Sequence, residues 1–546
     1  MGEKTSHPNI AKYLVDASTK HPNATAVISA KAGQFNPRSF QQLFEEVGVC
    51  SYLFKNKGIS EGDKVLLAVK PGYQLILIAF ALFQIGAVPV IIDPGMGVKS
   101  FIKCVRNTQP DALIGLPLIH IIKKFFPKTF RTIKKSISIQ NHTFLSTILQ
   151  NKEHRDKNFS SPGKEQIAAI VFTSGSTGPP KGVCYTHKMF NAQINHLKNN
   201  FGLESGEKDL STLPVFALFN PALGITSVIP DMNPRKPAKA DPKKLVYAMQ
   251  EFEINTAFAS PIIGRKIFSF CKINNITLPK VKRLMLAGAP TNPKLVINLN
   301  KYLPNGNVIL PYGATEALPI SAIDQNQIID LENEICRGKG SCLGKPLKGN
   351  FVKIMPITSS PFESGENCPK ELKVGETGEI CIAGQIASKK YYRMPGANID
   401  SKFNDGEKDY HRMGDLGYFD QNGLLRFLGR KAERIITKNG PLETERCEPI
   451  VNAINGVFRS ALIGIETGNQ QEPCLVVELD EKKTNKIKIK SEILEKLNTF
   501  LPNYQIKHIV FEISLPVDKR HNAKIHRLAL SKKWTKRFKH ASSLTS

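Results

Sequence analysis

The chain contains 546 residues, of which 41% are apolar and 22% are charged, and its formal net charge is +28. This composition describes a globular soluble chain with room for two or three cores, since one domain usually holds about 100–200 residues. The lysines are spread along the chain without the aromatic interleaving of an RNA-binding module. We therefore attribute the charge to a general compositional bias and expect no nucleic-acid partner.

The cysteines and the first residues bear on the cellular compartment. Ten cysteines form neither a paired framework nor a zinc spacing, and residues 1–6 contain no apolar signal segment. We therefore expect reduced thiols, no signal peptide and a cytoplasmic protein. The apolar run at 75–92 is interrupted by Gln84, Gly86 and Pro89. These interruptions favour a buried helix followed by a buried strand over a membrane span.

Residues 1–165 alternate strand-like runs with amphipathic segments. The strand-like runs lie at 26–29, 64–69, 88–92 and 112–114, and the amphipathic segments at 39–55 and 73–85. Strand, helix and strand in this order are typical of a parallel sheet covered by helices. The sequence thus predicts the α/β fold class.

A glycine-rich and hydroxyl-rich loop follows the apolar run at 167–172. Glycines let backbone N–H groups approach an anion closely, hydroxyls donate to phosphate oxygens, and one lysine balances part of a polyphosphate charge. The prolines before this lysine and the glycine after it argue against a Walker A loop, which leads into a helix. The residues that we expect to bind phosphate are Thr173, Ser174, Gly175, Ser176, Thr177, Gly178 and Lys181.

This loop resembles the signature of the adenylate-forming enzymes, the superfamily of acyl-CoA synthetases, luciferases and peptide-synthetase adenylation domains. Nearly the whole chain takes part in the resemblance. It implies a large N-terminal AMP-binding domain of helix-covered sheets at 1–430, which holds the ATP and acyl sites. It also implies a smaller, mobile α+β lid domain at 431–546. ATP and Mg²⁺ are the implied cofactors.

The resemblance places an acyl pocket in the apolar segment at 213–224. Family members carry a histidine or an aromatic residue there, and this chain offers Phe216, Leu218 and Phe219. The apolar character suits a long alkyl chain, although ordinary core packing explains any one of these residues equally well. Ser260, at a strand end, is a further pocket candidate.

The string PYGATE at 311–316 lies about 140 residues after the phosphate loop, in the order that the family shows. The resemblance implies that Tyr312 stacks on adenine beside Gly313, that Thr315 hydrogen-bonds the α-phosphate, and that Glu316 holds Mg²⁺. A flat ring suits a flat base, and a hard carboxylate oxygen suits a hard cation. The family also lays adenine and the acyl chain against the backbone of a strand end that here reads Gly288, Ala289 and Pro290.

Two further motifs carry the ribose contacts that the resemblance implies. Asp415 would accept hydrogen bonds from both ribose hydroxyls, and Arg430 would reach the ribose from the boundary between the domains. Near the C-terminus, Lys524 would bridge the attacking carboxylate and the α-phosphate. The chain departs from the family pattern in two places, because Ala432 replaces the usual Asp or Lys of the hinge and Ala523 replaces the glycine before Lys524.

The strings FALFNPALG (216–224), GPLETE (440–445) and RHNAKI (520–525) resemble the β-lactone synthetases of bacterial long-chain olefin biosynthesis. The resemblance implies adenylation of a 2-alkyl-3-hydroxy fatty acid, followed by closure to a β-lactone with release of AMP and pyrophosphate. It also implies that other olefin-biosynthesis enzymes are partners. The alternatives are a long-chain fatty acyl-CoA synthetase and a non-catalytic nucleotide-binding scaffold.

Two features are assigned by residue type alone. The base of the second step is open, with His187, His411 and His521 as candidates. The basic, aromatic tail at 532–539 could touch an anionic membrane surface, although a solvated charged end explains it better.

Overall fold

The computed structural model describes residues 7–30, 36–173, 179–213, 215–467, 470–480, 485–518 and 524–543. The βαβ pattern predicted for the first 165 residues is confirmed by a sheet with strand order β6-β5-β3-β4-β7-β8. Its strands pair in parallel except for β7 and β8, which are antiparallel. The strands are β3 (Lys64–Ala68), β4 (Val88–Ile92), β5 (Ala112–Gly115), β6 (Lys135–Ser138), β7 (Ile167–Thr173) and β8 (Lys181–Thr186).

A second, longer sheet has the strand order β16-β14-β13-β12-β11-β9-β10-β1-β2. Its central strands are parallel, whereas β13, β14 and β16 pair antiparallel at one end. Its strands are β1 (Thr25–Ala30), β2 (Arg38–Ser39), β9 (Lys208–Ser211), β10 (Thr226–Pro230), β11 (Thr256–Ala259), β12 (Arg283–Leu286), β13 (Asn307–Ala314), β14 (Ala317–Asp324) and β16 (Lys345–Pro346).

A third sheet is antiparallel and has the order β15-β21-β20-β18-β17, with β19 paired to β20. The sequence analysis did not predict this sheet. It carries Asp415 and Arg430 on neighbouring strands. Its strands are β15 (Ser341–Cys342), β17 (Asn350–Met355), β18 (Gly378–Gly384), β19 (Lys402–Asn404), β20 (Asp409–Phe419) and β21 (Leu425–Arg430).

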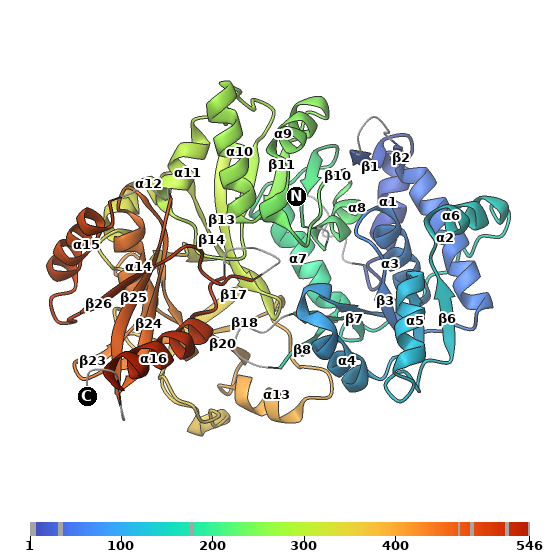
Figure 1. Cartoon of the computed structure of the whole chain (residues 1–546). Coiled ribbons are helices and arrows are strands. Elements are labelled where there is room, and N and C mark those ends of the chain that lie inside the picture. Colours follow the sequence, from blue (N-terminus) through green and yellow to red (C-terminus); the bar gives the residue numbers. More distant parts are fainter. Residues whose placement is uncertain are drawn as a thin grey trace.

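The C-terminal part forms its own sheet, β24-β25-β26, and a small hairpin of β22 and β23. Its apolar residues pack into two clusters drawn from residues 435–538. The red end of Figure 1 shows α15 and α16 beside this sheet. The division at residue 430 stays a prediction that these clusters support. The strands are β22 (Ile435–Thr437), β23 (Gly440–Leu442), β24 (Val457–Thr467), β25 (Gln470–Leu479) and β26 (His508–Glu512).

Local chemistry marks the start of α2 and the end of α3. The Ser39 hydroxyl accepts from the Gln42 N–H and the Gln42 side chain accepts from the Ser39 N–H, which caps α2, and Gly86 ends α3 with φ +75°. Among the described residues, no helix is long and apolar enough to cross a membrane. The helices are α1 (Lys12–Lys20), α2 (Phe40–Asn56), α3 (Tyr73–Ile85), α4 (Gly97–Thr108), α5 (Pro117–Phe125), α6 (Asn141–Gln150), α7 (His187–Asn199), α8 (Asn220–Leu223), α9 (Pro242–Glu251), α10 (Pro261–Asn274), α11 (Pro293–Asn300), α12 (Gln325–Ile335), α13 (Pro395–Ser401), α14 (Thr444–Asn452), α15 (Lys486–Phe500) and α16 (Arg527–Ser543).

The basic tail predicted to be a possible membrane contact is part of α16. Trp534 and Phe538 pack against the apolar cluster of the C-terminal sheet, and the hydroxyl-bearing Thr535 between them is buried. The aromatic residues of the tail therefore stabilise the C-terminal part from within. Both rings are partly buried by this packing, and the membrane contact of the tail stays a prediction.

Candidate active site

The predicted phosphate loop joins the antiparallel strands β7 and β8, in which Thr173 pairs with Lys181. The predicted phosphate ligands Ser174, Gly175, Ser176, Thr177 and Gly178 lie outside the described residues. Gly288, Ala289 and Pro290 follow β12, and Gly288 adopts φ +101°, which side chains rarely tolerate. The phosphate candidates thus follow a strand of the first sheet, whereas the adenine and acyl candidates follow a strand of the second.

Tyr312, Asp415 and Arg430 meet at the boundary between the second and third sheets. The Tyr312 hydroxyl donates to Asp415 Oδ2 at 2.6 Å. Arg430 Nη1 lies 3.0 Å from Asp415 Oδ1 and donates to the Met413 carbonyl oxygen at 3.2 Å. Asp415 faces Arg430 because β20 and β21 pair antiparallel in this register. The prediction had placed these three residues around one nucleoside, and the structure brings them together.

Burial raises the pKa of Asp415, and the positive charge of Arg430 opposes the shift. The charge of Lys524 is also among the causes that lower this pKa. Lys524 itself is exposed, and its backbone N–H donates to Asp518 Oδ1 at 2.9 Å. Lys524 therefore exerts its charge on the pocket that holds Asp415, although it belongs to the C-terminal part of the chain.

Glu316 lies in the turn between β13 and β14, next to an aromatic residue that the sequence analysis missed. The Tyr391 hydroxyl donates to Glu316 Oε1 at 2.8 Å. The ammonium groups of Lys181 and Lys402 lie 4.8 and 5.3 Å from the centre of the Tyr391 ring. Lys402 also donates to the Ser388 carbonyl oxygen. A carboxylate, a phenol and two amines thus gather beside the phosphate loop.

The pKa of Lys402 is lowered to about 7, chiefly because the amine is buried; the charge of Glu316 opposes the shift, and the neighbouring charge of Lys181 adds to it. Lys402 contributes from the start of β19, and Tyr391 comes from the segment before α13. Neither residue belongs to a recognisable motif. Tertiary contacts bring both of them close to Glu316. The string of two lysines and two tyrosines at 389–392 was the one visible signal.

The fit of Mg²⁺ to this site depends on Glu316. Among the described residues, no group of three or more His, Cys, Asp or Glu side chains could hold a metal ion. Mg²⁺ is usually bound through one or two carboxylates together with substrate phosphates and water. A single half-buried carboxylate beside a phosphate loop fits that pattern.

An apolar pocket lies next to these residues. Phe216 stacks on Phe258 with ring centres 3.8 Å apart. Of the predicted pocket residues, Phe216 and Phe219 line this pocket, Leu218 is buried in the adjoining core cluster, and Ser260 lies directly before α10. The lining residues are Gln193, Leu197, Phe201, Phe216, Phe219, Phe258, Met285, Pro311, Leu318 and Pro319.

Strands β13 and β14 and the turn between them contribute to both the apolar pocket and the polar site around Glu316. Pro311, Leu318 and Pro319 line the apolar pocket, whereas Tyr312 and Glu316, between them in the chain, face the polar groups. A carboxyl group at the end of an alkyl chain in this pocket would therefore lie beside the residues expected to contact ATP.

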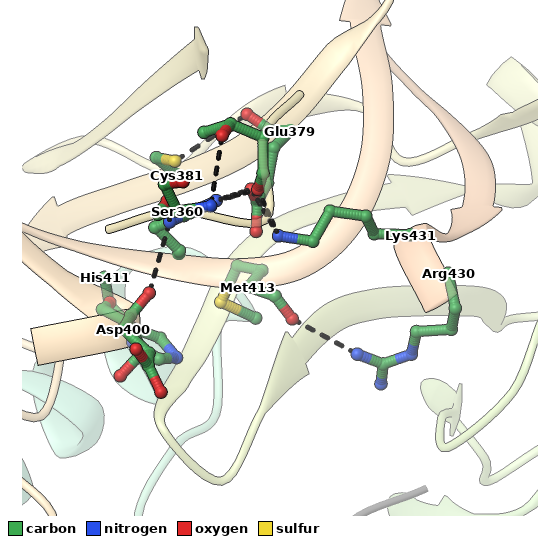
Figure 2. Close-up of polar contacts among 11 residues, drawn as sticks. Ser360, Glu379, Cys381, Asp400, His411, Met413, Arg430 and Lys431 are labelled. Atoms are coloured by element: carbon green, nitrogen blue, oxygen red, sulfur yellow. Dashed lines mark hydrogen bonds and ion pairs between the residues drawn. The ribbon is translucent and has the colours of Figure 1, made fainter. Parts of the chain in front are cut away.

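Lys431, the residue after Arg430, belongs to a buried ionic cluster with Glu379 and Arg412. Glu379 Oε2 lies 2.6 Å from Arg412 Nη2 and 2.9 Å from Lys431 Nζ. Arg412 also donates to the carbonyl oxygens of Ser360 and Asp400. Figure 2 shows that Arg430 and Lys431, although adjacent, diverge: Arg430 points toward Met413, and Lys431 toward Glu379. Lys431 therefore fastens the start of the C-terminal part to the third sheet.

Two of the three candidate bases are buried, and His521 lies outside the described residues. Burial lowers the pKa of His187 to about 4, and its Nδ1 accepts from the Ile10 backbone N–H at 3.4 Å. Burial also lowers the pKa of His411 well below its ordinary value, and its Nδ1 lies 3.1 Å from the Ser401 carbonyl oxygen. Both rings are held as neutral structural groups, and we assign neither as the base.

Known proteins resemble this chain over most of its length. A family model described as "AMP-binding enzyme" matches residues 14–392. A protein of Stenotrophomonas maltophilia (strain K279a) named "Olefin beta-lactone synthetase" is 38% identical over 541 residues, which cover 96% of this chain and 97% of the relative. A protein of Xanthomonas campestris pv. campestris with the same name is 37% identical over 550 residues, which cover 97% and 98%.

The fold also matches solved structures. The crystal structure of ATP-bound MatB from Rhodopseudomonas palustris superimposes with a TM-score of 0.79 at 18% identity, and the match covers 97% of this chain and 99% of that one. At this identity the match shows the fold alone. It confirms the predicted architecture of mixed α/β sheets with a smaller C-terminal part.

Proposed function

Because this chain belongs to the AMP-binding enzyme family, the adenylate-forming ligases, we propose that it converts a long-chain 2-alkyl-3-hydroxy fatty acid into a β-lactone at the expense of ATP. The observation that carries this proposal is the match, over nearly the full length, to two relatives named as olefin beta-lactone synthetases. The apolar pocket that shares the β13–β14 turn with the polar site supports an alkyl substrate.

In the first step, a carboxylate oxygen of the acid attacks the α-phosphorus of ATP, and the bond to pyrophosphate breaks. Both reactants are negatively charged, so the protein must offset repulsion and align the atoms. Lys181, Thr315 and Lys524 are the groups that we assign to the phosphates and the carboxylate. Asp415 and Arg430 would hold the ribose, and Tyr312 the adenine.

Glu316 would hold Mg²⁺, and the Tyr391 hydroxyl would orient its carboxylate. When bound, Mg²⁺ supplies positive charge that neutralises phosphate oxygens. Lys181 and the protonated form of Lys402 would offset the negative charge of Glu316 at this point. The protein's own groups thus prepare a site for a polyanion.

In the second step, the oxygen of the substrate's 3-hydroxyl attacks the acyl carbon, and the bond from that carbon to AMP breaks. The hydroxyl proton passes to the solvent, and the new bond between the 3-oxygen and the acyl carbon closes a four-membered lactone. A tethered nucleophile gains an effective molarity of up to about 10⁵–10⁸ M in well-oriented cases, which helps against ring strain. Release of AMP completes the turnover.

The proposal is tested by product analysis. The purified protein is incubated with ATP, Mg²⁺ and a 2-alkyl-3-hydroxy fatty acid, with and without CoA, and the products are identified by mass spectrometry. We expect AMP and a product lighter than the acid by one water, in equal amounts and independent of CoA. A thioester formed only with CoA would instead identify a fatty acyl-CoA synthetase. AMP release in neither condition would indicate a scaffold without activity.

A further inference from the structure

One polar side chain lies in the wall of the apolar pocket among the described lining residues. Gln193, on α7, is 2% exposed, and its Nε2 donates to the Leu318 carbonyl oxygen at 3.1 Å. Its Oε1 is buried and accepts no hydrogen bond from any part of the chain that the structure describes. A buried acceptor without a donor is unfavourable, because folding removes its water without replacing it.

The position of Gln193 relates it to the reacting end of the substrate. Its side chain is among the groups that lower the pKa of Tyr185, and the Tyr185 hydroxyl donates to the Thr315 carbonyl oxygen at 2.7 Å. Leu318, whose carbonyl oxygen accepts from Gln193 Nε2, follows the turn between β13 and β14 that contains Thr315. Gln193 thus lies where the apolar pocket meets the turn that carries Thr315 and Glu316.

A carboxyl group that reacts beside Thr315 has its C3 atom only two bonds away. A hydroxyl on C3 would therefore lie at the inner end of the pocket, where it needs an acceptor. We propose that Gln193 Oε1 accepts a hydrogen bond from the 3-hydroxyl of the acyl substrate, so that Gln193 selects 3-hydroxy acids and positions this hydroxyl. This inference rests on the proposed function and deepens it.

The hydrogen bond explains selectivity in physical terms. When an acid without the hydroxyl binds, its alkyl chain would exclude water from the pocket and leave Gln193 Oε1 without a hydrogen-bond donor. An unpaired buried acceptor of this kind weakens binding of the transition state. An amide oxygen is too weak a base to remove the proton. Gln193 is therefore a positioning residue, which holds the hydroxyl oxygen near the acyl carbon.

Gln84 provides a matched comparison. It is also buried, its Nε2 donates to the Asp156 carbonyl oxygen at 2.7 Å, and its Oε1 also lacks a partner among the described residues. However, it lies within α3, away from the residues that line the pocket. An unpaired amide oxygen alone therefore does not define a substrate contact, and Gln193 is distinguished by its place in the pocket wall.

The test compares 3-hydroxyhexadecanoic acid with hexadecanoic acid by ATP–pyrophosphate exchange, which reports adenylation alone. We expect the wild type to favour the hydroxy acid in kcat/KM by about tenfold, the equivalent of one net hydrogen bond. Gln193→Met should bring this ratio close to one, whereas Gln84→Met should keep it. An equal loss for both acids in Gln193→Met would show that only the contact to Leu318 matters and would overturn the inference.

A second measurement does not depend on folding of the variant. The wild type is given 3-fluorohexadecanoic acid, in which fluorine replaces the hydroxyl with similar size but without a hydrogen to donate. We expect its kcat/KM to resemble that of hexadecanoic acid, and a value equal to that of the hydroxy acid would overturn the inference. If the hydroxy acid is preferred but no lactone forms, the proposed function fails while the role of Gln193 stands.

Discussion

Replacing Glu379 by glutamine should destabilise the protein far more than removing its partner Lys431. Glu379 is 1% exposed, and it contacts Arg412, whose side chain is 3% exposed, and Lys431, whose side chain is 29% exposed. Glu379→Gln keeps the size of the side chain but leaves the Arg412 charge buried without a counter-ion, which costs about 3–5 kcal/mol. The backbone carbonyls that still accept from Arg412 place the expected loss at the lower end.

Lys431→Met is the matched control, because it leaves the pair of Glu379 and Arg412 intact. The loss of a partly exposed ion pair should cost about 1 kcal/mol. Both variants are compared with the wild type by urea unfolding followed by circular dichroism. The dependence of the unfolding free energy on urea concentration should be the same in all three proteins. Equal losses in the two variants would refute the reasoning. A loss below about 1 kcal/mol in Glu379→Gln would also refute it, since no unpaired buried charge would then have been created.

Three further predictions follow from named contacts. Arg430→Met removes the cation beside Asp415, so we expect ATP affinity to fall about tenfold in equilibrium binding, and unchanged affinity would contradict a shared ribose site. His187 stays neutral in the folded protein down to a pKa of about 4, below its ordinary value of 6.5. Protonation of His187 should therefore cost the wild type up to about 3 kcal/mol of stability as pH falls from 6.5 to 4. In urea unfolding across that range, His187→Gln should lose less stability than the wild type by about this amount, because His411, whose pKa burial also lowers, contributes equally in both proteins. Phe216→Ala removes a ring stacked on Phe258 and should shift the kcat/KM preference toward longer or bulkier acids; an unchanged preference would place the chain elsewhere.

The sequence allowed prediction of features that depend on neighbouring residues. The strands at 64–69, 88–92 and 112–114 and the helices at 39–55 and 73–85 were confirmed within one or two residues, because their apolar patterns and end signals are local. The prediction that 73–85 is amphipathic was wrong, since α3 is buried at every residue from Ile76 to Ile85. Asp415 and Arg430 were assigned to one ribose from motifs alone, and their strands pair with these two residues opposite each other.

Other features depend on contacts between distant segments. Tyr391 and Lys402 approach Glu316 only after the third sheet packs against the second, and neither stands in a motif that signals a site. The cluster of Glu379, Arg412 and Lys431 joins separate strands and a hinge turn. Whether Phe216 lines a pocket or fills the core was open from the sequence, because an aromatic residue in an apolar run serves either purpose.

The segment after Arg430 illustrates the same limit. Ala432 departs from the family pattern, so the sequence did not predict which residue attaches the C-terminal part. The structure shows that the preceding residue, Lys431, contacts Glu379 and the Thr358 carbonyl oxygen instead. The ion pair of Arg527 with Glu433 and Glu448 then fixes α16 to the residues that follow. These contacts join residues that are far apart in the sequence, so no local pattern predicts them.

The central claim is that Lys524, from the C-terminal part, acts on the same nucleotide as Asp415 and Glu316 when a carboxyl group is joined to AMP. It is tested most directly by ATP–pyrophosphate exchange with a 3-hydroxy fatty acid in Lys524→Ala, alongside equilibrium binding of ATP. We predict that exchange falls by about 100-fold or more, whereas ATP affinity changes little. Exchange near the wild-type rate would contradict the claim.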